Sequence, residues 1–488
     1  MEIPRLEPCI PLPLEDSVLE DLVDKAKDWA IMNGAGMRSK LKFSKNELHF
    51  APFMLLPSTF PKREFEKAVA IQPILNELMH KVAHSYEFLS ESLKSTIEVD
   101  DFTKRLFQIY ETVRKEGFTQ SVSLGLLRSD YLHNCATDNI KQVEINTIAS
   151  SFAGISVQIT DMNRYVLQEL GHADLLPHLP ENNALQGLCG GMIEAWKLYG
   201  KPESVILFVV EDITYNICDQ RFHEFEIRKM EPKVRVIRRT LTDLGKRSTL
   251  TEEKILMIDG LEVAVVYYRS GYAPTQYHSE LEWEARLKVE RSLSIKCPSI
   301  QYHLAGTKRV QQALASPAVL ERFLDSSVAA SVREIFTGLY TLDLSDEGNA
   351  AVEMALKNPT HYVLKPQREG GGNNVYGEEV KLMLEKMGNS NERSAWILME
   401  RIIPPVQRCY LIHPNSDTPV YTDVVSELGI FGVIIGDEKV ILKNSQVGHM
   451  LRTKVATANE GGVAAGYGAL DSPFLVEMKS CCHPIIQN

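Results

Sequence analysis

The sequence predicts an α/β protein whose N-terminal part is mainly helical. Between residues 15 and 115, apolar residues recur at spacings of three and four. Two short apolar runs, 204–210 and 263–268, are separated by helical segments, and further strand-like runs follow residue 360. A change from helical periodicity to alternating strands and helices indicates mixed layers of helices and sheets.

The helical signal dominates residues 15–115. The stretch "EDSVLEDLVDKAKDWAIMNG" keeps its apolar residues on one helical face and stops at a glycine, as helices commonly do. The segment "STFPKREF" predicts a turn, and another long helical stretch follows it. We therefore expect residues 1–115 to form a helical part of the main domain.

The segment "KQVEINTI" alternates as a strand does. Side chains of a strand point to opposite faces in turn, so Val143 and Ile145 share one face. Glu144 and Asn146 share the other. Two oxygen-bearing side chains therefore lie side by side on one face.

Residues 204–304 are predicted to form an α/β unit. Its runs "SVILFVV" and "VAVVYY" look like central strands that are buried on both faces. The basic stretch at 228–240 alternates as a half-exposed strand with its cationic residues outward.

A helix is expected in the same unit, in "LEWEARLKVERSLSIK". Glu282 precedes Arg286 by four residues, and Glu284 precedes Lys288 by the same spacing. This order favours ion pairs on a solvated helix face.

Helices are expected after residue 305, followed by three strands, "THYVLKP", "SAWILMERI" and "PVYTDVVSELGIFGVII". We expect the last two to pair in an antiparallel sheet beside a glycine-rich loop. The chain contains no internal repeat and no low-complexity linker.

Composition excludes several classes of function. The 488 residues are 44% hydrophobic and 24% charged, as in ordinary globular proteins, and are enough for about two to four domains. A net charge of −11 disfavours nucleic acid as a partner. No apolar run reaches the ~18 residues that span a membrane.

Targeting signals and cysteines indicate a cytoplasmic protein. The start, "MEIPRLEPCIPLPLED", lacks the basic and apolar regions of a signal peptide. The eight cysteines occur singly apart from Cys481–Cys482, and no CxxC spacing is present. That pattern is typical of reduced thiols. The cysteine pair and His483 lie in the last eight residues and are interpreted as tail.

The stretch "KPQREGGGNNVYGEE" places three consecutive glycines after a strand that ends at Lys365. Glycine weakens helices and strands, so such a run indicates a backbone that approaches a charged ligand closely, with phosphate as the first candidate. A P-loop, a protein-kinase site and a dinucleotide fingerprint are excluded, because GxxxxGK[ST], HRD, DFG and GxGxxG are absent here.

Carboxylates near this loop suggest a cation site. Glu144 and Asn146 would supply half of an oxygen-ligand set for Mg²⁺, and Glu369 the other half. The alternative is that Glu144 and Asn146 are only the solvent side of a strand.

A second loop of small residues also follows a stretch that carries cationic side chains. "HMLRTK" would place Arg452 and Lys454 on one face of a strand, and "NEGGVAAGYG" follows. Such loops are usually turns. Two of them, each preceded by cationic residues, suggest movable covers over an anionic pocket.

The motifs together resemble those of the eukaryotic glutathione synthetases, which are ATP-grasp ligases. The resemblance runs in order from about residue 120 to 475, through "EINTIASSFAG", "DQR", "RSGY", "LAGTKRVQQ", "LKPQREGGGNNVYGEE", "ILMERI", "SELGIFGV" and "GHMLRTK" with "EGGVAAG".

The resemblance implies an ATP-grasp core with mixed and antiparallel sheets and an inserted, smaller α/β substrate domain. The core would comprise residues 116–203 and 305–488, the second part carrying the glycine-rich lid and the alanine-rich loop. The inserted domain would be 204–304, and residues 1–115 the helical part of the main domain.

The resemblance also implies roles for single residues. Glu144, Asn146 and Glu369 would bind two Mg²⁺ ions. Lys308 and Lys365 would hold the phosphates of ATP and act in catalysis with Arg452. Further residues would enclose the nucleotide: Glu144, Gly370, Gly371, Gly372, Asn373, Asn374, Tyr376, Met399, Glu400, Arg401, Ile402, Glu427, Lys454 and Glu460.

A second set is implied for the dipeptide γ-glutamylcysteine. Its arginines suit carboxylate groups because the planar guanidinium binds them with two hydrogen bonds. The positions are Arg128, Ala149, Ser150, Ser151, Asn216, Gln220, Arg269, Ser270, Gly271, Tyr272, Arg452, Val463 and Ala464.

The chain departs from the family pattern at four places. Ala149 replaces a serine found in many relatives, so a contact there is left to the backbone. Ser270 stands where an acidic residue is common, and Thr214–Tyr215 where some members have charges before Asn216. Glu460 replaces an aspartate of some members.

The implied reaction joins γ-glutamylcysteine to glycine. The cysteinyl carboxylate attacks the γ-phosphate of ATP, and glycine displaces phosphate from the resulting acyl phosphate. One alternative is a ligase that uses β-alanine, although the intact Ala464 and Ala465 favour glycine. The other is a non-catalytic nucleotide-binding relative, which the intact metal and arginine positions disfavour. Family members form homodimers, so we expect a homodimer.

Overall fold

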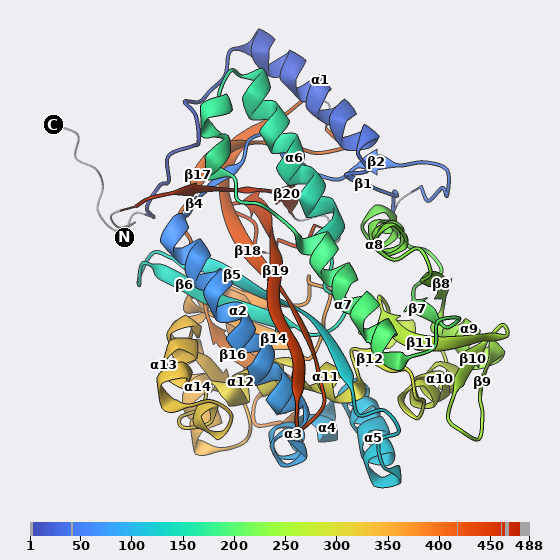
Figure 1. Cartoon of the computed structure of the whole chain (residues 1–488). Helices are drawn as coiled ribbons and strands as arrows, with labels where there is room; N and C mark the ends of the chain where they lie inside the picture. The colour runs from blue at the N-terminus through green and yellow to red at the C-terminus, as the bar shows by residue number, and fades with distance from the viewer. Residues whose placement is uncertain (1–2, 41, 417, 460, 464–467, 479–488) are drawn as a thin grey trace.

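The computed structural model describes residues 3–40, 42–416, 418–459, 461–463 and 468–478. The residues predicted from the sequence at Glu460, Ala464 and Ala465, and at the terminal cysteine pair, lie outside these ranges. Figure 1 shows the arrangement of the chain. No helix in these ranges combines the length and apolarity needed to cross a bilayer.

A seven-stranded sheet organises the main part of the molecule. Its centre is the long antiparallel pair β18 and β19, which runs through the middle of Figure 1. The strand order is β17-β3-β20-β19-β18-β5-β6, and β17 also pairs with β18. The strands are β3 (Phe53–Met54), β5 (Ser123–Asn134), β6 (Asn139–Asn146), β17 (Gln407–Ile412), β18 (Val420–Gly436), β19 (Ile441–Val455) and β20 (Ala469–Asp471).

Two further sheets flank it. A four-stranded sheet has the order β13-β16-β14-β15 and consists of β13 (Leu339–Thr341), β14 (Tyr362–Pro366), β15 (Val375–Tyr376) and β16 (Trp396–Glu400). A six-stranded sheet has the order β8-β7-β11-β10-β9, with β12 beside β11. Its members are β7 (Val205–Val209), β8 (Arg235–Arg239), β9 (Ser248–Leu250), β10 (Leu256–Ile258), β11 (Leu261–Tyr268) and β12 (Ile295–Cys297).

Two short pairs complete the strands. They are β1 (Gly36–Met37) with β2 (His49–Phe50), and β4 (Ser58–Pro61) with β21 (Pro473–Val476). The predicted turn at "STFPKREF" is therefore wrong in its first half. Ser58–Pro61 forms a buried strand because a distant segment near the end of the described chain supplies its hydrogen-bond partners.

The helices cover the sheets on several sides. The α-helices are α1 (Asp16–Met32), α2 (Lys62–Ala83), α3 (Tyr86–Leu93), α4 (Thr96–Val99), α5 (Asp101–Glu116), α6 (Ala153–Glu169), α7 (Ala184–Tyr199), α8 (Ile217–Met230), α9 (Leu241–Arg247), α10 (Glu280–Glu290), α11 (Ile300–Ala305), α12 (Lys308–Leu314), α13 (Ser326–Ile335), α14 (Asp346–Lys357) and α15 (Glu378–Met387). The 3₁₀ turns are η1 (Ala173–His178), η2 (Pro274–Gln276), η3 (Leu320–Arg322), η4 (Pro359–His361) and η5 (Asn391–Ala395).

Both faces of the seven-stranded sheet are buried. On β5, Leu127 belongs to the core shared with α2, α5 and α11, whereas its neighbour Leu126 belongs to the core shared with α1, α6 and α7. Adjacent strand residues point to opposite faces, so helices sandwich the sheet. Helix α7 approaches closely at Gly191, where an added Cβ would lie 2.7 Å from a methyl of Val433.

The predicted strands at 204–210 and 263–268 are confirmed as β7 and β11, which pair in parallel and are buried. The basic stretch at 228–240 divides differently from the prediction. Its first residues end α8, and only Arg235–Arg239 forms a strand.

The solvated face predicted for α10 is wrong for the Glu282–Arg286 pair, whereas Glu284 is exposed and Lys288 is half-buried. Arg286 is fully buried, contacts Glu290 at 3.2 Å and lies over the ring of Tyr268. Glu282 is also buried, and it caps the helix by accepting hydrogen bonds from Ser279. The helix turns this face toward the six-stranded sheet, which spacing within the helix does not reveal.

The predicted pairing of the last two strands is also wrong. "SAWILMERI" forms β16 and pairs with β14 and β13, whereas "PVYTDVVSELGIFGVII" forms β18 in the seven-stranded sheet. The long β19 is the antiparallel neighbour of β18. The two sheets lie on either side of the candidate site.

A buried histidine predicts how stability depends on pH. His80, only 3% exposed, accepts a hydrogen bond from Tyr302 at Nδ1 and donates one from Nε2 to the carbonyl oxygen of Asp437. Burial lowers the pKa of His80 from 6.5 to about 4. His80 therefore binds a proton below pH 6.5 in the unfolded chain but only below about pH 4 in the folded chain.

We expect this histidine to contribute up to about 3 kcal/mol of stability above pH 6.5, which is lost as the pH falls to about 4. His80→Gln should flatten the decline in the free energy of unfolding across this window, measured by denaturant titration at several pH values. An identical slope in the variant would show that His80 is not responsible.

Candidate active site

A cleft lies between the seven-stranded and four-stranded sheets. Strands β5, β6, β18 and β19 supply one wall, and β14, β16 and the glycine loop supply the other. Most residues predicted for the site line it: Glu144, Asn146, Glu369, Lys365, Gly370, Gly371, Asn374, Tyr376, Met399, Glu400, Arg401, Ile402, Glu427, Lys454, Arg128, Ala149, Ser151, Tyr272, Arg452 and Val463.

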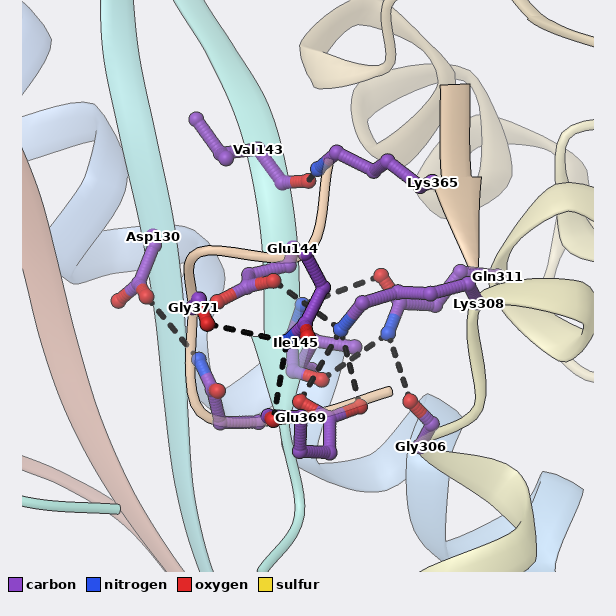
Figure 2. Close-up of polar contacts among 12 residues, drawn as sticks. Asp130, Val143, Glu144, Ile145, Gly306, Lys308, Gln311, Lys365, Glu369 and Gly371 are labelled. Atoms are coloured by element: carbon purple, nitrogen blue, oxygen red, sulfur yellow. Dashed lines mark hydrogen bonds and ion pairs between the residues drawn. The ribbon is translucent and has the colours of Figure 1, made fainter. Parts of the chain in front are cut away.

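Lys308 does not itself line the cleft, but it joins two carboxylates that do. Nζ of Lys308 lies 3.0 Å from a carboxylate oxygen of Glu144 and 2.9 Å from one of Glu369. Figure 2 shows the lysine reaching between them. Lys308 is buried, and both carboxylate groups are mostly buried. Three side chains far apart in the sequence thus share one charged centre.

Local structure fixes this centre. Lys308 is the first residue of α12, which Thr307 caps by accepting a hydrogen bond from the Val310 amide. On the next turn of α12, the Gln311 side chain bonds both the amide and the carbonyl of Ile145. That pair of bonds ties the helix to β6, beside Glu144.

A bulge in β6 positions the second lysine. Asp130 of β5 pairs with Glu144, and the next residue pairs with Gln142, so Val143 is an extra residue in β6. The carbonyl oxygen of Val143 accepts a hydrogen bond of 2.8 Å from Nζ of Lys365. The bulge interrupts the alternation predicted for this strand, because Val143 lines the cleft together with Glu144 and Asn146.

An aspartate contacts two of the arginines that line the cleft, Arg128 and Arg452. Asp130 binds Arg128 through two hydrogen bonds of 2.6 and 2.8 Å, and it lies 3.5 Å from Arg452. It also accepts a hydrogen bond from the amide of Asn146 at 3.0 Å. Arg452 forms its closest ion pair with Glu427. Sequence reasoning missed Asp130, although its position two residues after Arg128 on a strand was a usable signal.

These charges shift one another's ionisation. Burial works against ionised Glu144, but Lys308 and Lys365 outweigh it and lower the pKa of Glu144. Burial raises the pKa of Glu369 despite Lys308, and it raises the pKa of Glu427 despite Arg452. The cations therefore outweigh burial at Glu144, and at Glu369 and Glu427 they offset only part of it.

The cleft changes from charged to apolar along its strands. On β14, Lys365 is followed toward the other end by Val363, two residues away on the same face. On β18, Glu427 gives way to Val425 in the same manner. Aliphatic groups of Leu132, Ile402, Ile403, Pro404 and Val406 also line the cleft, and Lys454 of β19 lies opposite Val425. This gradient suits a ligand with a charged end and a flat apolar end.

The glycine loop adopts a backbone that other residues resist. Gly370, Gly371 and Gly372 all have positive φ, at 95°, 73° and 76°. A Cβ at Gly370 would meet the ring of Tyr272 at 3.4 Å. Gly372 and Asn373 do not line the cleft, and the Asn373 side chain bonds the carbonyl of Gly371.

Two arginines hold the loop between β6 and α6. Arg269 donates to the carbonyl of Ser150 at 3.0 Å and to the hydroxyl of Ser151 at 2.7 Å. From the opposite side, Arg128 donates to the carbonyl of Ser151 at 3.0 Å. Ala149, which has a positive φ of 53°, lines the cleft.

Asp219 is a second residue that sequence reasoning missed. It is fully buried, accepts hydrogen bonds from the amides of Phe152 and Gly154, and lies 3.4 Å from Arg269. It thereby caps α6, whose N-terminal residue has no side-chain cap of its own. Only its place in the motif "DQR" signalled it.

Several predicted substrate residues lie behind the cleft wall. Asn216 and Gln220 belong to α8 or its start, and their side chains contact Asp219 and Arg238. Ser150, Arg269, Ser270 and Gly271 also do not line the cleft.

The oxygen ligands available here fit a hard divalent cation. Glu144 and Glu369 contact the same ammonium group, so their carboxylates already converge on one positive charge. Asn146 uses its amide nitrogen for Arg128 and Asp130, which leaves its oxygen for a ligand. Among the described residues, no group of three or more His, Cys, Asp or Glu side chains could hold a metal ion. A metal ion in this cleft would therefore also need amide oxygens or oxygens of the ligand.

Comparison with known proteins gives consistent results over nearly the whole chain. Residues 16–475 match the model of "Eukaryotic glutathione synthase, ATP binding domain". The glutathione synthetase of Xenopus laevis is 45% identical over 469 residues, which cover 95% of this chain and 98% of that protein. The human glutathione synthetase is 44% identical over 465 residues, with 94% and 97% covered.

A solved structure agrees. A glutathione synthetase-like effector from Globodera pallida matches with a TM-score of 0.77 at 25% identity, covering 96% of this chain and 100% of the other.

The role of Asp130 in the cleft leads to a stability prediction. Asp130→Asn preserves size but removes the charge that pairs with buried Arg128. We expect the free energy of unfolding to fall by about 3 kcal/mol, because a buried guanidinium loses its carboxylate partner. Urea denaturation measures this. Glu280→Gln removes an exposed carboxylate that pairs with Arg105 and should have little effect. Equal stability of Asp130→Asn and the parent chain would contradict the role given to Asp130.

Proposed function

The chain belongs to the eukaryotic glutathione synthase family, and we propose that its cleft is the active site of that family's ATP-dependent ligation. It joins the cysteinyl carboxylate of γ-glutamylcysteine to the amine of glycine, through an acyl phosphate. The products are glutathione, ADP and phosphate.

The charged centre carries this proposal. A carboxylate does not react with an amine unless it gains a leaving group, and ATP supplies one as phosphate. The attacking carboxylate and the triphosphate both carry negative charge, so they repel. Lys308, Lys365 and Arg452 converge on the cleft and would offset that repulsion.

In the first step, a carboxylate oxygen of the dipeptide bonds to the γ-phosphorus as the bond from that phosphorus to ADP breaks. Lys308 and Lys365 are assigned to the phosphates, and Arg452 to the reacting carboxylate. In the second step, the glycine nitrogen bonds to the acyl carbon, the acyl–phosphate bond breaks, and the nitrogen loses a proton. No side-chain nucleophile takes part, so positioning and charge carry the catalysis.

We assign Mg²⁺ to Glu144, Asn146 and Glu369, with two ions expected. When bound, the metal would neutralise phosphate charge where these oxygens converge. Lys308 now contacts both carboxylates, and it would turn its ammonium toward the phosphates once the metal shares them.

The dipeptide is assigned to the loop at 149–151 and its arginine supports. Arg128 is bound by Asp130, and Arg269 donates to the Ser150 carbonyl and the Ser151 hydroxyl. Each arginine therefore either keeps one N–H donor for the substrate or shapes the loop that contacts the substrate. Nε of Arg452 is buried and makes no protein hydrogen bond among the described residues, which leaves a donor for a carboxylate.

Water must be kept from the acyl phosphate, which hydrolyses easily. We assign this task to the glycine loop at 370–374 and to the alanine-rich loop that ends at residue 468. Glycine backbones with positive φ allow the first loop to lie against a ligand without a Cβ in the way.

The remaining assignments rest on the family and the sequence. We propose a homodimer, a cytoplasmic location and a substrate-binding role for residues 204–304. The six described cysteines are all free, as expected for reduced thiols, and the six-stranded sheet is formed within 204–304.

The function is tested by measuring ADP release from purified protein. We expect release to require ATP, γ-glutamylcysteine, glycine and Mg²⁺, because the acyl phosphate turns over only when an amine removes it. Replacing glycine by β-alanine should lower the rate at least tenfold. Equal rates with both amino acids would indicate the homoglutathione-type ligase. ATP binding without any ADP release would indicate a non-catalytic relative.

A further inference from the structure

The N-terminal segment, residues 3–6, lies along the edge of the cleft. Arg5 forms a parallel β-bridge with Val406, the amide of Leu6 donates to the Val406 carbonyl at 2.9 Å, and the Val406 amide donates to the carbonyl of Pro4 at 3.0 Å. Two main-chain hydrogen bonds fix this segment to the chain that leads from β16 to β17.

Side chains fasten the same segment on both sides. The guanidinium of Arg5 binds both carboxylate oxygens of Asp423 on β18, at 2.9 and 2.6 Å. Asp423 also pairs with Arg408, and the Arg5 and Arg408 hydrogen bonds lower the pKa of Asp423 to about 2. Leu6 is buried, and the hydroxyl of Thr59 donates to the carbonyl of Glu7. An exposed ion pair is weak alone, but a fork with two bonds beside a β-bridge restricts the segment well.

This anchoring delivers Ile3 to the cleft. Ile3 lines the apolar end together with Ile403, Pro404 and Val406. Its side chain is 46% exposed, so a ligand in the cleft can reach it. The apolar end lies along β14 and β18 away from Lys365 and Glu427, with Lys454 beside Val425, so a bound nucleotide would place its base there.

The segment precedes the residues that match the family model. The match to the family model begins at residue 16, whereas the anchored segment and Ile3 precede it. Nothing in the reaction itself requires it.

We propose that residues 3–6 form a strap that closes the base end of the nucleotide site, with Ile3 packing on the purine ring and Arg5 holding the strap in place. This rests on the proposed function, because it takes ATP as the ligand of the cleft. Ile3 would cover the ring opposite the aliphatic groups of β14 and β18. The strap contributes to nucleotide affinity and leaves the phosphate end unchanged.

Calorimetric titration of the full-length protein tests the strap. Ile3→Ala should raise the dissociation constant of Mg²⁺·ATP about fivefold, as the loss of about one buried methylene's worth of apolar contact implies. Binding of inorganic tripolyphosphate with Mg²⁺ should stay within twofold of the parent protein, because it has no base. Val18→Ala removes an equally exposed aliphatic side chain on α1, outside the cleft, and should change neither constant.

Arg5→Ala tests the strap by a second substitution. If Arg5 acts by holding Ile3, the single change should weaken ATP by about the same factor, and the double variant should be no weaker than Arg5→Ala. Unchanged ATP affinity in Ile3→Ala would overturn the strap. Equal weakening of ATP and tripolyphosphate would do so as well, because it would indicate a general loosening of the cleft.

ATP binding and ADP release together distinguish a failure of the strap from a failure of the proposed ligation. If ATP binding depends on Ile3 but no ADP is released with the substrates, the strap stands and the proposed ligation fails. If ADP is released normally and ATP affinity ignores Ile3, the ligation stands and the strap is refuted.

Discussion

The charged centre formed by Lys308, Glu144 and Glu369 constrains the rest of the structure. Its members come from α12, β6 and the glycine loop, and the ammonium group contacts both carboxylates. Lys365 and Arg452 add two more cations from β14 and β19. Negative charges this close are stable only when positive charges are fixed beside them, so each element that carries a cation must be held in register with the others.

The fold meets this constraint through its sheet alternation. Along β14 and β18, residues two apart place a charge and then an aliphatic group on the same face, so one cleft has a polar end and an apolar end. The bulge at Val143 turns a carbonyl toward Lys365. Asp130 and Asp219 fix the arginines and the loop at 149–152 from behind. Helices cover both sheet faces, so the strands cannot shift to relieve the charge.

Sequence patterns predicted the α/β class, the central strands of the six-stranded sheet, and the placement of Glu144 and Asn146 on one strand. They failed where the answer depended on residues distant in the chain. The burial of Arg286 depends on the sheet packed against α10. The pairing of β16 with β14 joins two strands that the glycine loop and α15 separate in the sequence. Spacing along β5 could have linked Asp130 to Arg128, but its contacts with Asn146 and Arg452 lie on other strands and local patterns do not report them. Local spacing reports alternation, not which elements meet.

The account claims that fixed cations permit phosphate transfer to a carboxylate, and Arg452→Ala tests this most directly. Steady-state kinetics and ATP binding should be measured together, with Arg291→Ala, an arginine paired with Glu116 away from the cleft, as control. The account predicts that Arg452→Ala lowers kcat by about a hundredfold or more while ATP affinity changes less than threefold. Equal losses of kcat and ATP affinity would contradict it.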